Sequence, residues 1–232
     1  LLQQYPFVTG IMVGEGEETF LSLLKYYLGE GAGSLQEIPG LALLEGDTCE
    51  RELVDISKVP FLYTAGGVSG MQDFENRIIY YESSRGCPFR CSYCLSSIDK
   101  KVRLRDLELA KKELQFFLDR NVAQVKFIDR TFNANAKRAN EIIEFILENR
   151  GTKIPENVCF HFEIAGDILK EETFKILEKA PKGLFQLEIG MQSFNEETLK
   201  AINRKTDTKK LIENIKRLVS FNNMHIHIDL IA

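Results

Sequence analysis

The sequence predicts an α/β fold in which parallel strands form part of a (β/α) barrel. From residue 78 onward, apolar runs of strand length alternate with amphipathic segments of helical periodicity, the pattern of consecutive βαβ units. Three of the runs are apolar on one face and polar or ionisable on the other. A doubly wound sheet is covered by helices on both faces and needs two apolar faces. The alternation therefore favours a barrel with helices outside and a polar lumen inside.

The individual elements follow from the positions of these runs. Strands are predicted at residues 78–84, 124–129, 158–165, 184–190 and 225–231. Apolar residues at helical spacing predict helices at residues 106–119, 137–149, 171–179 and 208–221. These elements are about five strands of a partial (β/α)6 TIM-like barrel, and the last strand stands at the end of the sequence. Because an uncovered parallel strand leaves an unpaired apolar edge, we interpret the chain as truncated before the last strand of the barrel.

The polar faces of the last three strands are rich in ionisable residues. The polar-face residues are Cys159, His161, Glu163, Gln186, Glu188, Gly190, His225, His227 and Asp229, with Gln192 just beyond the fourth strand. Closed eight-stranded barrels fill their interior with branched apolar side chains. A polar interior therefore predicts a wider or open barrel that holds a polar ligand. An α+β fold with one solvated sheet face is the alternative that gives the same alternation.

The first 76 residues differ from the rest of the chain. One helix is predicted at residues 17–28, where apolar side chains recur at helical spacing. The rest of this stretch predicts turns, and residues 65–70, which are rich in glycine, predict an exposed linker. Because strands and helices do not alternate here, we expect residues 1–76 to be the remnant of another domain with a linker, and residues 77–232 to be the barrel.

Composition and charge narrow the range of functions. The 232 residues carry a net charge of −4, which argues against binding of nucleic acid or an anionic membrane through bulk electrostatics. No apolar run approaches the roughly 18 residues of a membrane-spanning helix, and no signal-peptide pattern opens the sequence. These features predict a cytoplasmic protein. Five cysteines, an odd number at low density, argue against a disulfide framework and favour metal binding by clustered thiols.

Three of the cysteines are clustered directly after the first predicted strand. Cys87, Cys91 and Cys94 have the spacing Cys-x3-Cys-x2-Cys. In barrel enzymes the loop after a strand lies at the C-terminal mouth, where chemistry occurs. Three thiolates can bind three corners of a 4Fe-4S cluster and leave the fourth iron open to a substrate or cofactor. A zinc site is the alternative, and it needs a fourth ligand from Cys49, Cys159 or a histidine.

A second candidate metal site lies on the last predicted strand. His225 and His227 form a His-x-His pair there, an arrangement that barrel metallohydrolases use. Such a site needs further His or carboxylate ligands, and His161 is the only other histidine in the sequence. The alternatives to an iron-sulfur enzyme are therefore a zinc-stabilised binding module and a His-x-His metallohydrolase.

The cysteine motif, with the aromatic Tyr93 before its last cysteine, resembles the signature of the radical S-adenosylmethionine (SAM) superfamily. Residues 187–194, 201–205 and 228–232 are similar to blocks of one branch. That branch includes oxygen-independent coproporphyrinogen oxidase and iron-sulfur oxidoreductases with cobalamin-binding domains. The resemblance covers the barrel portion, about two thirds of the chain. The N-terminal remnant is similar to the end of a Rossmann-like cobalamin-binding domain.

The resemblance implies roles for individual residues. Cys87, Cys91 and Cys94 bind a 4Fe-4S cluster whose fourth iron chelates the amino and carboxylate groups of SAM. The implied SAM contacts are Tyr93 along the adenine, Glu163 and Gln192 at strand ends, Arg204 on the carboxylate, Asp229 on the ribose hydroxyls and Asp129 on the ammonium. A guanidinium fork does match a carboxylate in shape and charge. Three of these positions also belong to the predicted lumen side.

The same resemblance implies an enzymatic activity. One electron from the reduced cluster cleaves SAM to methionine and a 5′-deoxyadenosyl radical, which abstracts hydrogen from a small-molecule or other substrate. The protein orients the reactants and excludes water and oxygen. Implied partners are an external electron donor such as flavodoxin or ferredoxin and, in a longer protein, cobalamin for methyl transfer to an unactivated carbon. The chain has no Asp-x-His-x-x-Gly cobalamin-ligand motif, and it identifies neither a substrate nor a catalytic side chain.

Overall fold

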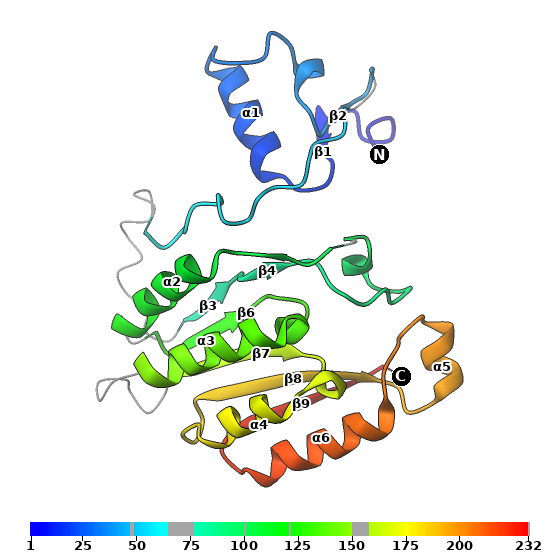
Figure 1. Cartoon of the computed structure of the whole chain (residues 1–232). Coiled ribbons are helices and arrows are strands. Elements are labelled where there is room, and N and C mark those ends of the chain that lie inside the picture. The colour runs from blue at the N-terminus through cyan, green and yellow to red at the C-terminus, as the bar shows by residue number, and fades with distance from the viewer. Residues whose placement is uncertain (47–48, 65–76, 100, 121, 150–157, 232) are drawn as a thin grey trace. The chain divides into compact units, whose positions relative to one another are not determined.

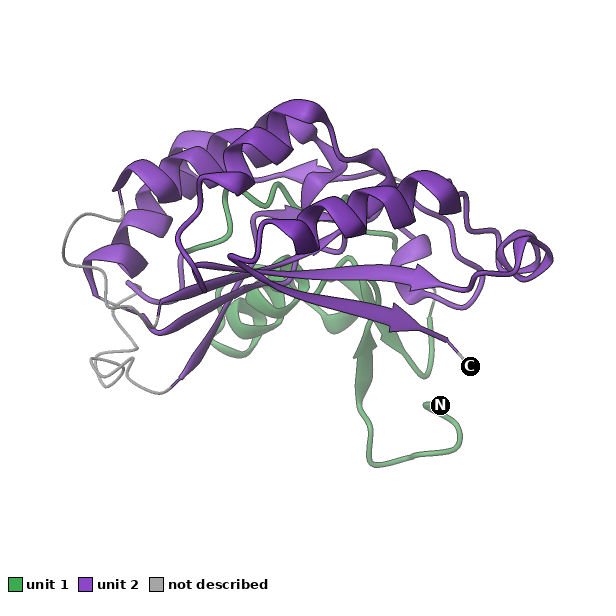
Figure 2. Ribbon diagram, turned by 90° about the horizontal axis from the view of Figure 1, so that it is seen from below, with its two compact units in different colours: residues 1–60 green, residues 61–232 purple. Residues whose placement is uncertain are grey.

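The computed structural model describes residues 1–46, 49–64, 77–99, 101–120, 122–149 and 158–231. The chain divides into two compact units, Leu1–Pro60 and Phe61–Ala232, which Figure 2 distinguishes by colour. The predicted domain boundary after residue 76 and the predicted linker at residues 65–70 lie outside the described residues. Within the described residues, none of the helices combines the length and the apolar character that a membrane crossing requires.

The N-terminal unit contains one α-helix and a small sheet. α1 (Glu17–Tyr27) confirms the helix predicted for this stretch. β1 (Gly10–Met12) pairs with β2 (Leu41–Leu43) in an antiparallel sheet, and a 3-10 turn at Leu35–Glu37 precedes β2. The prediction that the rest of this stretch contains only turns was therefore wrong. Strands of three residues are too short to show an alternating pattern, and they form through pairing with a distant segment.

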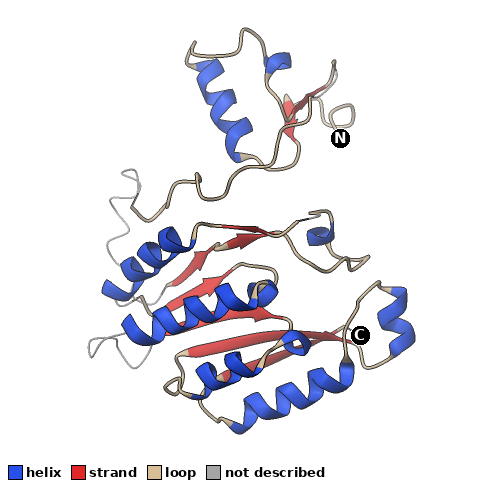
Figure 3. Cartoon of the chain, viewed as in Figure 1, coloured by secondary structure: helices blue, strands red, loops and turns tan. Residues whose placement is uncertain are grey.

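The C-terminal unit is built on a five-stranded parallel sheet, shown in Figures 1 and 3. Its strands are β3 (Ile78–Tyr81), β6 (Gln124–Phe127), β7 (Cys159–Ile164), β8 (Phe185–Gln192) and β9 (His225–Leu230). They are hydrogen-bonded in that order, and every pair is parallel. All five predicted strands are confirmed. Because neighbours in the sheet are neighbours along the chain, the sheet has the strand order of a barrel wall, whereas a doubly wound fold reverses its order.

Four long helices link these strands and cover one face of the sheet, as Figure 2 shows. They are α2 (Leu107–Asp119), α3 (Ala136–Asn149), α4 (Glu171–Glu178) and α6 (Thr208–Ser220), close to the predicted ranges. The buried core between helices and sheet includes Phe160, Phe162, Phe185, Leu187 and Ile189. The opposite face of the sheet carries the polar residues. The partial barrel with outer helices is therefore confirmed, and the all-parallel sheet excludes the α+β alternative.

Burial of the apolar strand faces differs along the sheet. Phe162 in β7 and Leu187 in β8 are fully buried. In β9, which is an edge strand of the sheet, Ile228 is 45% exposed and Leu230 is 57% exposed. The alternation predicted from the sequence thus corresponds to complete burial in β7 and β8 and to incomplete burial in β9.

Several short elements were not predicted. They are β4 (Ser84–Arg85), which pairs antiparallel with β5 (Arg103–Leu104), the short helix α5 (Glu196–Ala201), and 3-10 turns at Leu95–Ser97, Phe132–Ala134 and Gly166–Ile168. Each spans six residues or fewer, too few for a periodic pattern to identify. These elements shape the ends of the strands, where the candidate site lies.

Helix α6 begins at an N-cap. The carboxylate of Asp207 accepts a hydrogen bond from the backbone N–H of Lys210 at 3.0 Å. Asp207→Ala is expected to lower the free energy of unfolding by about 1 kcal/mol, because that amide loses its partner. Asp207→Asn, which caps about as well, should change it by much less. Chemical denaturation measures the free energy of unfolding of both variants. An equal loss in Asp207→Ala and Asp207→Asn would contradict the capping role.

Candidate functional site

The three clustered cysteines lie in the loop between β4 and β5. β4 follows β3 directly, so the loop leaves the sheet at the C-terminal end of β3. The β4–β5 pair closes the base of the loop. Gly86 has φ +94°, and a Cβ at this position would collide with the backbone carbonyl of Lys101, so glycine is required. The local structure thus places the cysteines at the end of the sheet where barrel enzymes carry out chemistry.

The segment that follows α5 holds the cysteine loop by hydrogen bonds. The backbone N–H of Ser92 donates to the carbonyl of Ile202 at 2.9 Å. The Nδ2 of Asn203 donates to the carbonyl of Arg90 at 2.8 Å. Residues 90–92 and 202–203 are more than 100 positions apart in the sequence, so these bonds fix the loop to a distant part of the unit.

Two of the cysteine sulfurs contact polar side chains. The Sγ of Cys87 lies 3.4 Å from the Oγ1 of Thr131. Cys91 is 5% exposed, and its Sγ accepts a long contact of 3.8 Å from the Nη1 of Arg204. The guanidinium of Arg204 also lies over the ring of Phe89, 3.9 Å from the ring centre. Polar side chains and a cation thus lie beside two of the three sulfurs of the motif.

A polar cavity lies at the carboxyl ends of β7, β8 and β9. Four of the six predicted SAM contacts line it, namely Glu163, Gln192, Arg204 and Asp229. Arg130, Thr131 and Glu188 line it as well. Arg204 therefore touches a cysteine sulfur and the cavity at once. The structure brings together the positions that were predicted from distant parts of the sequence.

Tyr93 is joined to this group through Gln192. The hydroxyl of Tyr93 donates to the Oε1 of Gln192 at 2.5 Å, and half of the Tyr93 side chain is exposed. Gln192 has φ +67°, and the β8–β9 register shifts between Gly190 and Gln192. This irregularity ends the regular ladder of β8 and lets the Gln192 side chain lie beside the cysteine loop. Five of the six predicted SAM contacts thus form one connected group.

Asp129, the sixth, is not part of that group. Its carboxylate accepts from the backbone N–H of Ser83 at 2.7 Å, from the Ser83 hydroxyl at 2.6 Å and from the Ser84 hydroxyl at 2.7 Å. The residue is 1% exposed. Burial raises the pKa of Asp129, and the hydrogen bonds from Ser83 and Ser84 oppose that rise. In this structure the carboxylate binds the start of the cysteine loop.

Glu188 adds a carboxylate that sequence analysis placed on the lumen face without a role. Its Oε2 lies 3.0 Å from the Nε2 of His161 and 3.6 Å from the Nζ of Lys126. Burial lowers the pKa of His161, the charge of Lys126 lowers it further, and the nearby Glu188 opposes that shift. Burial and the nearby Glu188 raise the pKa of Glu163. Glu188, which lines the cavity, therefore interacts with His161 and Lys126 and influences the neighbouring carboxyl group of Glu163.

Arg130, Thr131 and Glu188 are the polar side chains of the cavity that sequence analysis did not predict as SAM contacts. Glu188 shares its strand face with Gln192, so the alternation along β8 contained a signal for it. Arg130 and Thr131 lie three and four positions after the end of β6. Residues that follow a barrel strand generally lie at the mouth of the barrel, which was a general signal for a site. No local pattern indicated that these two residues lie close to β7.

The alternative metal sites gain no support from the described residues. Among residues 1–46, 49–64, 77–99, 101–120, 122–149 and 158–231, no three side chains of His, Cys, Asp or Glu converge closely enough to hold one metal ion. A single zinc ion needs such convergence. A 4Fe-4S cluster does not require its ligands to converge on one ion, because each thiolate binds a different iron at a separate corner. The Nε2 of His227 lies 3.2 Å from the Nε2 of Gln186, and His225 is exposed.

Proteins with similar sequences include a cyclase and a radical SAM methyltransferase. The chain is 26% identical over 234 residues to anaerobic magnesium-protoporphyrin IX monomethyl ester cyclase of Cereibacter sphaeroides, covering 94% of this chain and 37% of that protein. It is 25% identical to the cobalamin-dependent radical SAM methyltransferase TokK of Streptomyces tokunonensis, covering 99% of this chain and 35% of that protein. The chain thus spans about a third of the length of these relatives.

A solved structure shares the fold. The chain superposes with a TM-score of 0.74 on the cobalamin-dependent S-adenosylmethionine radical enzyme OxsB bound to aqua-cobalamin and S-adenosylmethionine. The identity is 24%, and the match covers 99% of this chain and 34% of that protein. The radical SAM superfamily itself matches residues 81–230, which include the cysteine motif, the cavity residues and all but the first residues of the sheet. The chain belongs to the radical SAM superfamily.

Proposed function

We propose that this chain carries the SAM-cleaving core of a radical SAM enzyme, with a 4Fe-4S cluster on Cys87, Cys91 and Cys94. One observation supports the proposal most: Arg204 lies 3.8 Å from the sulfur of Cys91 and also lines the polar cavity. The cysteine loop and the cavity therefore share a side chain. A cofactor that bridges an iron and the cavity would explain that arrangement.

The residues around the cavity suit the charges of SAM, which carries a carboxylate, an ammonium and a sulfonium. The Arg204 guanidinium would pair with the carboxylate. Glu163 and Asp229 would accept from the ammonium and the ribose hydroxyls, and Tyr93 would lie along the adenine. When bound, the reduced cluster supplies the electron that cleaves SAM to methionine and a 5′-deoxyadenosyl radical. The chain's own task is to orient SAM and to keep water from the cavity.

For the net reaction we propose either oxidation of a substrate after hydrogen abstraction or cobalamin-dependent methyl transfer. A relative named as a cobalamin-dependent radical SAM methyltransferase supports the second reaction. Cobalamin would bind in a longer protein, because residues 1–60 carry no Asp-x-His-x-x-Gly motif. The substrate would be a small molecule or another unknown compound, with a flavodoxin or ferredoxin as electron donor. We propose the cytoplasm as the compartment, because its reducing conditions suit exposed and half-buried free thiols. We propose no membrane or nucleic acid partner.

SAM cleavage by the isolated chain tests this proposal. The chain is reconstituted with iron and sulfide without oxygen and then incubated with dithionite and SAM. Mass spectrometry should detect 5′-deoxyadenosine with the wild type. Cys91→Ala should abolish it, because a cluster with two thiolates is not retained. Cys159→Ala is the matched control and should keep it, since Cys159 lies on β7 outside the motif.

Two outcomes would count against the proposal. One is a wild-type chain that holds a full cluster yet forms no 5′-deoxyadenosine. The other is equal cleavage by Cys91→Ala and Cys159→Ala.

A further inference from the structure

The segment that follows β6 contacts the cysteine loop at two separate places. At the first, Asp129 binds Ser83 and Ser84 through three hydrogen bonds of 2.6–2.7 Å. Both serines are buried, 1% and 4% exposed. Because Ser84 stands three positions before Cys87, these bonds fix the backbone from which the first cysteine of the motif extends. Asp129 is therefore a positioning residue for the loop.

The second contact reaches a cysteine directly. The Oγ1 of Thr131 lies 3.4 Å from the Sγ of Cys87 and 2.7 Å from the carbonyl of Arg130. The Thr131 side chain is nearly enclosed, because the residue is 4% exposed. The hydroxyl proton has two acceptors within reach, the carbonyl of Arg130 and the sulfur of Cys87.

In a 4Fe-4S cluster the Cys87 sulfur would bind iron as a thiolate. A thiolate has no proton to donate, so only the threonine hydroxyl can supply one along the 3.4 Å contact. The hydroxyl then turns from a neutral carbonyl to an anionic sulfur, and hydrogen bonds to charged acceptors are the stronger ones.

We propose that Thr131 donates a hydrogen bond to the Cys87 thiolate and thereby raises the reduction potential of the cluster that the loop holds. This inference rests on the proposed function, since it requires a cluster on Cys87. Reduction adds one electron, supplied by an external donor, to a group that is already anionic. A donor beside a ligand sulfur stabilises the added charge, and hydrogen bonds to the sulfurs are among the factors that set cluster potentials. Thr131 thus makes the cluster easier to reduce.

Substitutions at Thr131 separate this role from a purely structural one. Thr131→Val keeps the branched shape and removes the hydroxyl, whereas Thr131→Ser keeps the hydroxyl and removes a methyl group. The full chain is reconstituted without oxygen, and the reduced fraction is followed by electron paramagnetic resonance in a redox titration without SAM. In Thr131→Val the ratio of reduced to oxidised cluster at a fixed potential should fall roughly fivefold, the effect of one ordinary hydrogen bond. Thr131→Ser should match the wild type.

Iron content distinguishes a failure of this inference from a failure of the proposed function. If the wild type binds no cluster, the proposed function fails. If the clusters form and the reduction potential is the same in Thr131→Val, Thr131→Ser and the wild type, the proposed function stands and the inference is overturned. Loss of iron in Thr131→Val with full iron in Thr131→Ser would also overturn it, because Thr131 would then be required for cluster binding and would not tune the potential.

Discussion

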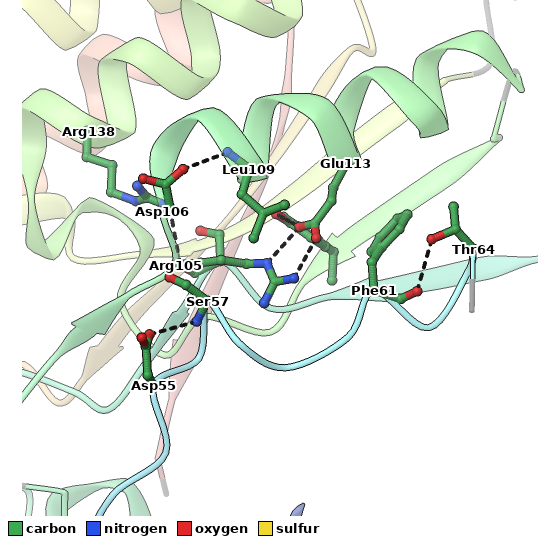
Figure 4. A network of polar contacts seen from close by, with 11 residues as sticks. Asp55, Ser57, Phe61, Thr64, Arg105, Asp106, Leu109, Glu113 and Arg138 are labelled. Atoms are coloured by element: carbon green, nitrogen blue, oxygen red, sulfur yellow. Dashed lines mark hydrogen bonds and ion pairs between the residues drawn. The ribbon is translucent and has the colours of Figure 1, made fainter. Parts of the chain in front are cut away.

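Replacing Glu113 by alanine is expected to lower the free energy of unfolding by about 3–5 kcal/mol. Glu113 and Arg105 form a buried ion pair, 4% and 6% exposed, shown in Figure 4. The Arg105 Nε and Nη2 donate to Glu113 at 2.8 and 2.5 Å, and the Tyr81 hydroxyl donates at 2.8 Å. The alanine variant removes the carboxylate that accepts from the buried Arg105 guanidinium and from the Tyr81 hydroxyl, and breaking a buried pair in this way is costly. Urea denaturation measures the loss.

The same helix provides the control for this prediction. Glu108 in α2 pairs with Lys111 at 2.9 Å, and its side chain is 74% exposed. Exposed pairs of this kind contribute between roughly 0 and 1 kcal/mol, so Glu108→Ala should change stability little. A loss for Glu113→Ala as small as that for Glu108→Ala would show that the contacts of Glu113 with Arg105 and with Tyr81 of β3 do not stabilise the fold.

Replacing Arg204 by alanine is expected to weaken SAM binding about 30-fold or more. Arg204 is half-buried, lines the cavity and is held by Phe89 and by the hydroxyl of Thr206 at 3.0 Å. Loss of one partner from a buried, hydrogen-bonded charge pair costs about 2–5 kcal/mol, which corresponds to at least that factor. Equilibrium dialysis of SAM against the reconstituted chain without oxygen measures the dissociation constant.

Two further variants make the Arg204 result specific. Lys205→Ala removes the exposed neighbouring charge and should bind SAM as the wild type does. Arg204→Lys keeps the charge but loses the planar fork, so it should fall between alanine and wild type. Iron content must be equal in all four proteins, because Arg204 also approaches Cys91. An unchanged dissociation constant in Arg204→Ala with full iron would remove Arg204 from the SAM site.

The long elements of the barrel could be predicted from the sequence because burial imposes a period on them. In β7 and β8, side chains alternate between the helix-covered face and the lumen, and the helices repeat apolar residues at helical spacing. The same alternation placed Glu163, Gln192 and Asp229 on one side, and the cavity brings them together. The alternation along the strands therefore predicted both the fold and three residues of the site.

The short elements and the loop contacts could not be predicted, because they depend on partners far away in the chain. β4 is two residues long and exists only through its pairing with β5. The Asp129 carboxylate binds serines 45 and 46 positions earlier, and Thr131 meets Cys87 across 44 positions. No local pattern specifies such contacts. A motif can therefore identify the cysteines, but only the structure shows what holds them.

Metal analysis of the chain purified without oxygen tests the central claim most directly. The account predicts about four iron atoms and four sulfides per chain after reconstitution, with the open iron ready for SAM. The Cys159→Ala variant should match this content, and simultaneous replacement of Cys87, Cys91 and Cys94 by alanine should remove it. One zinc ion per chain without iron, or less than one iron with all three cysteines intact and reduced, would contradict the account.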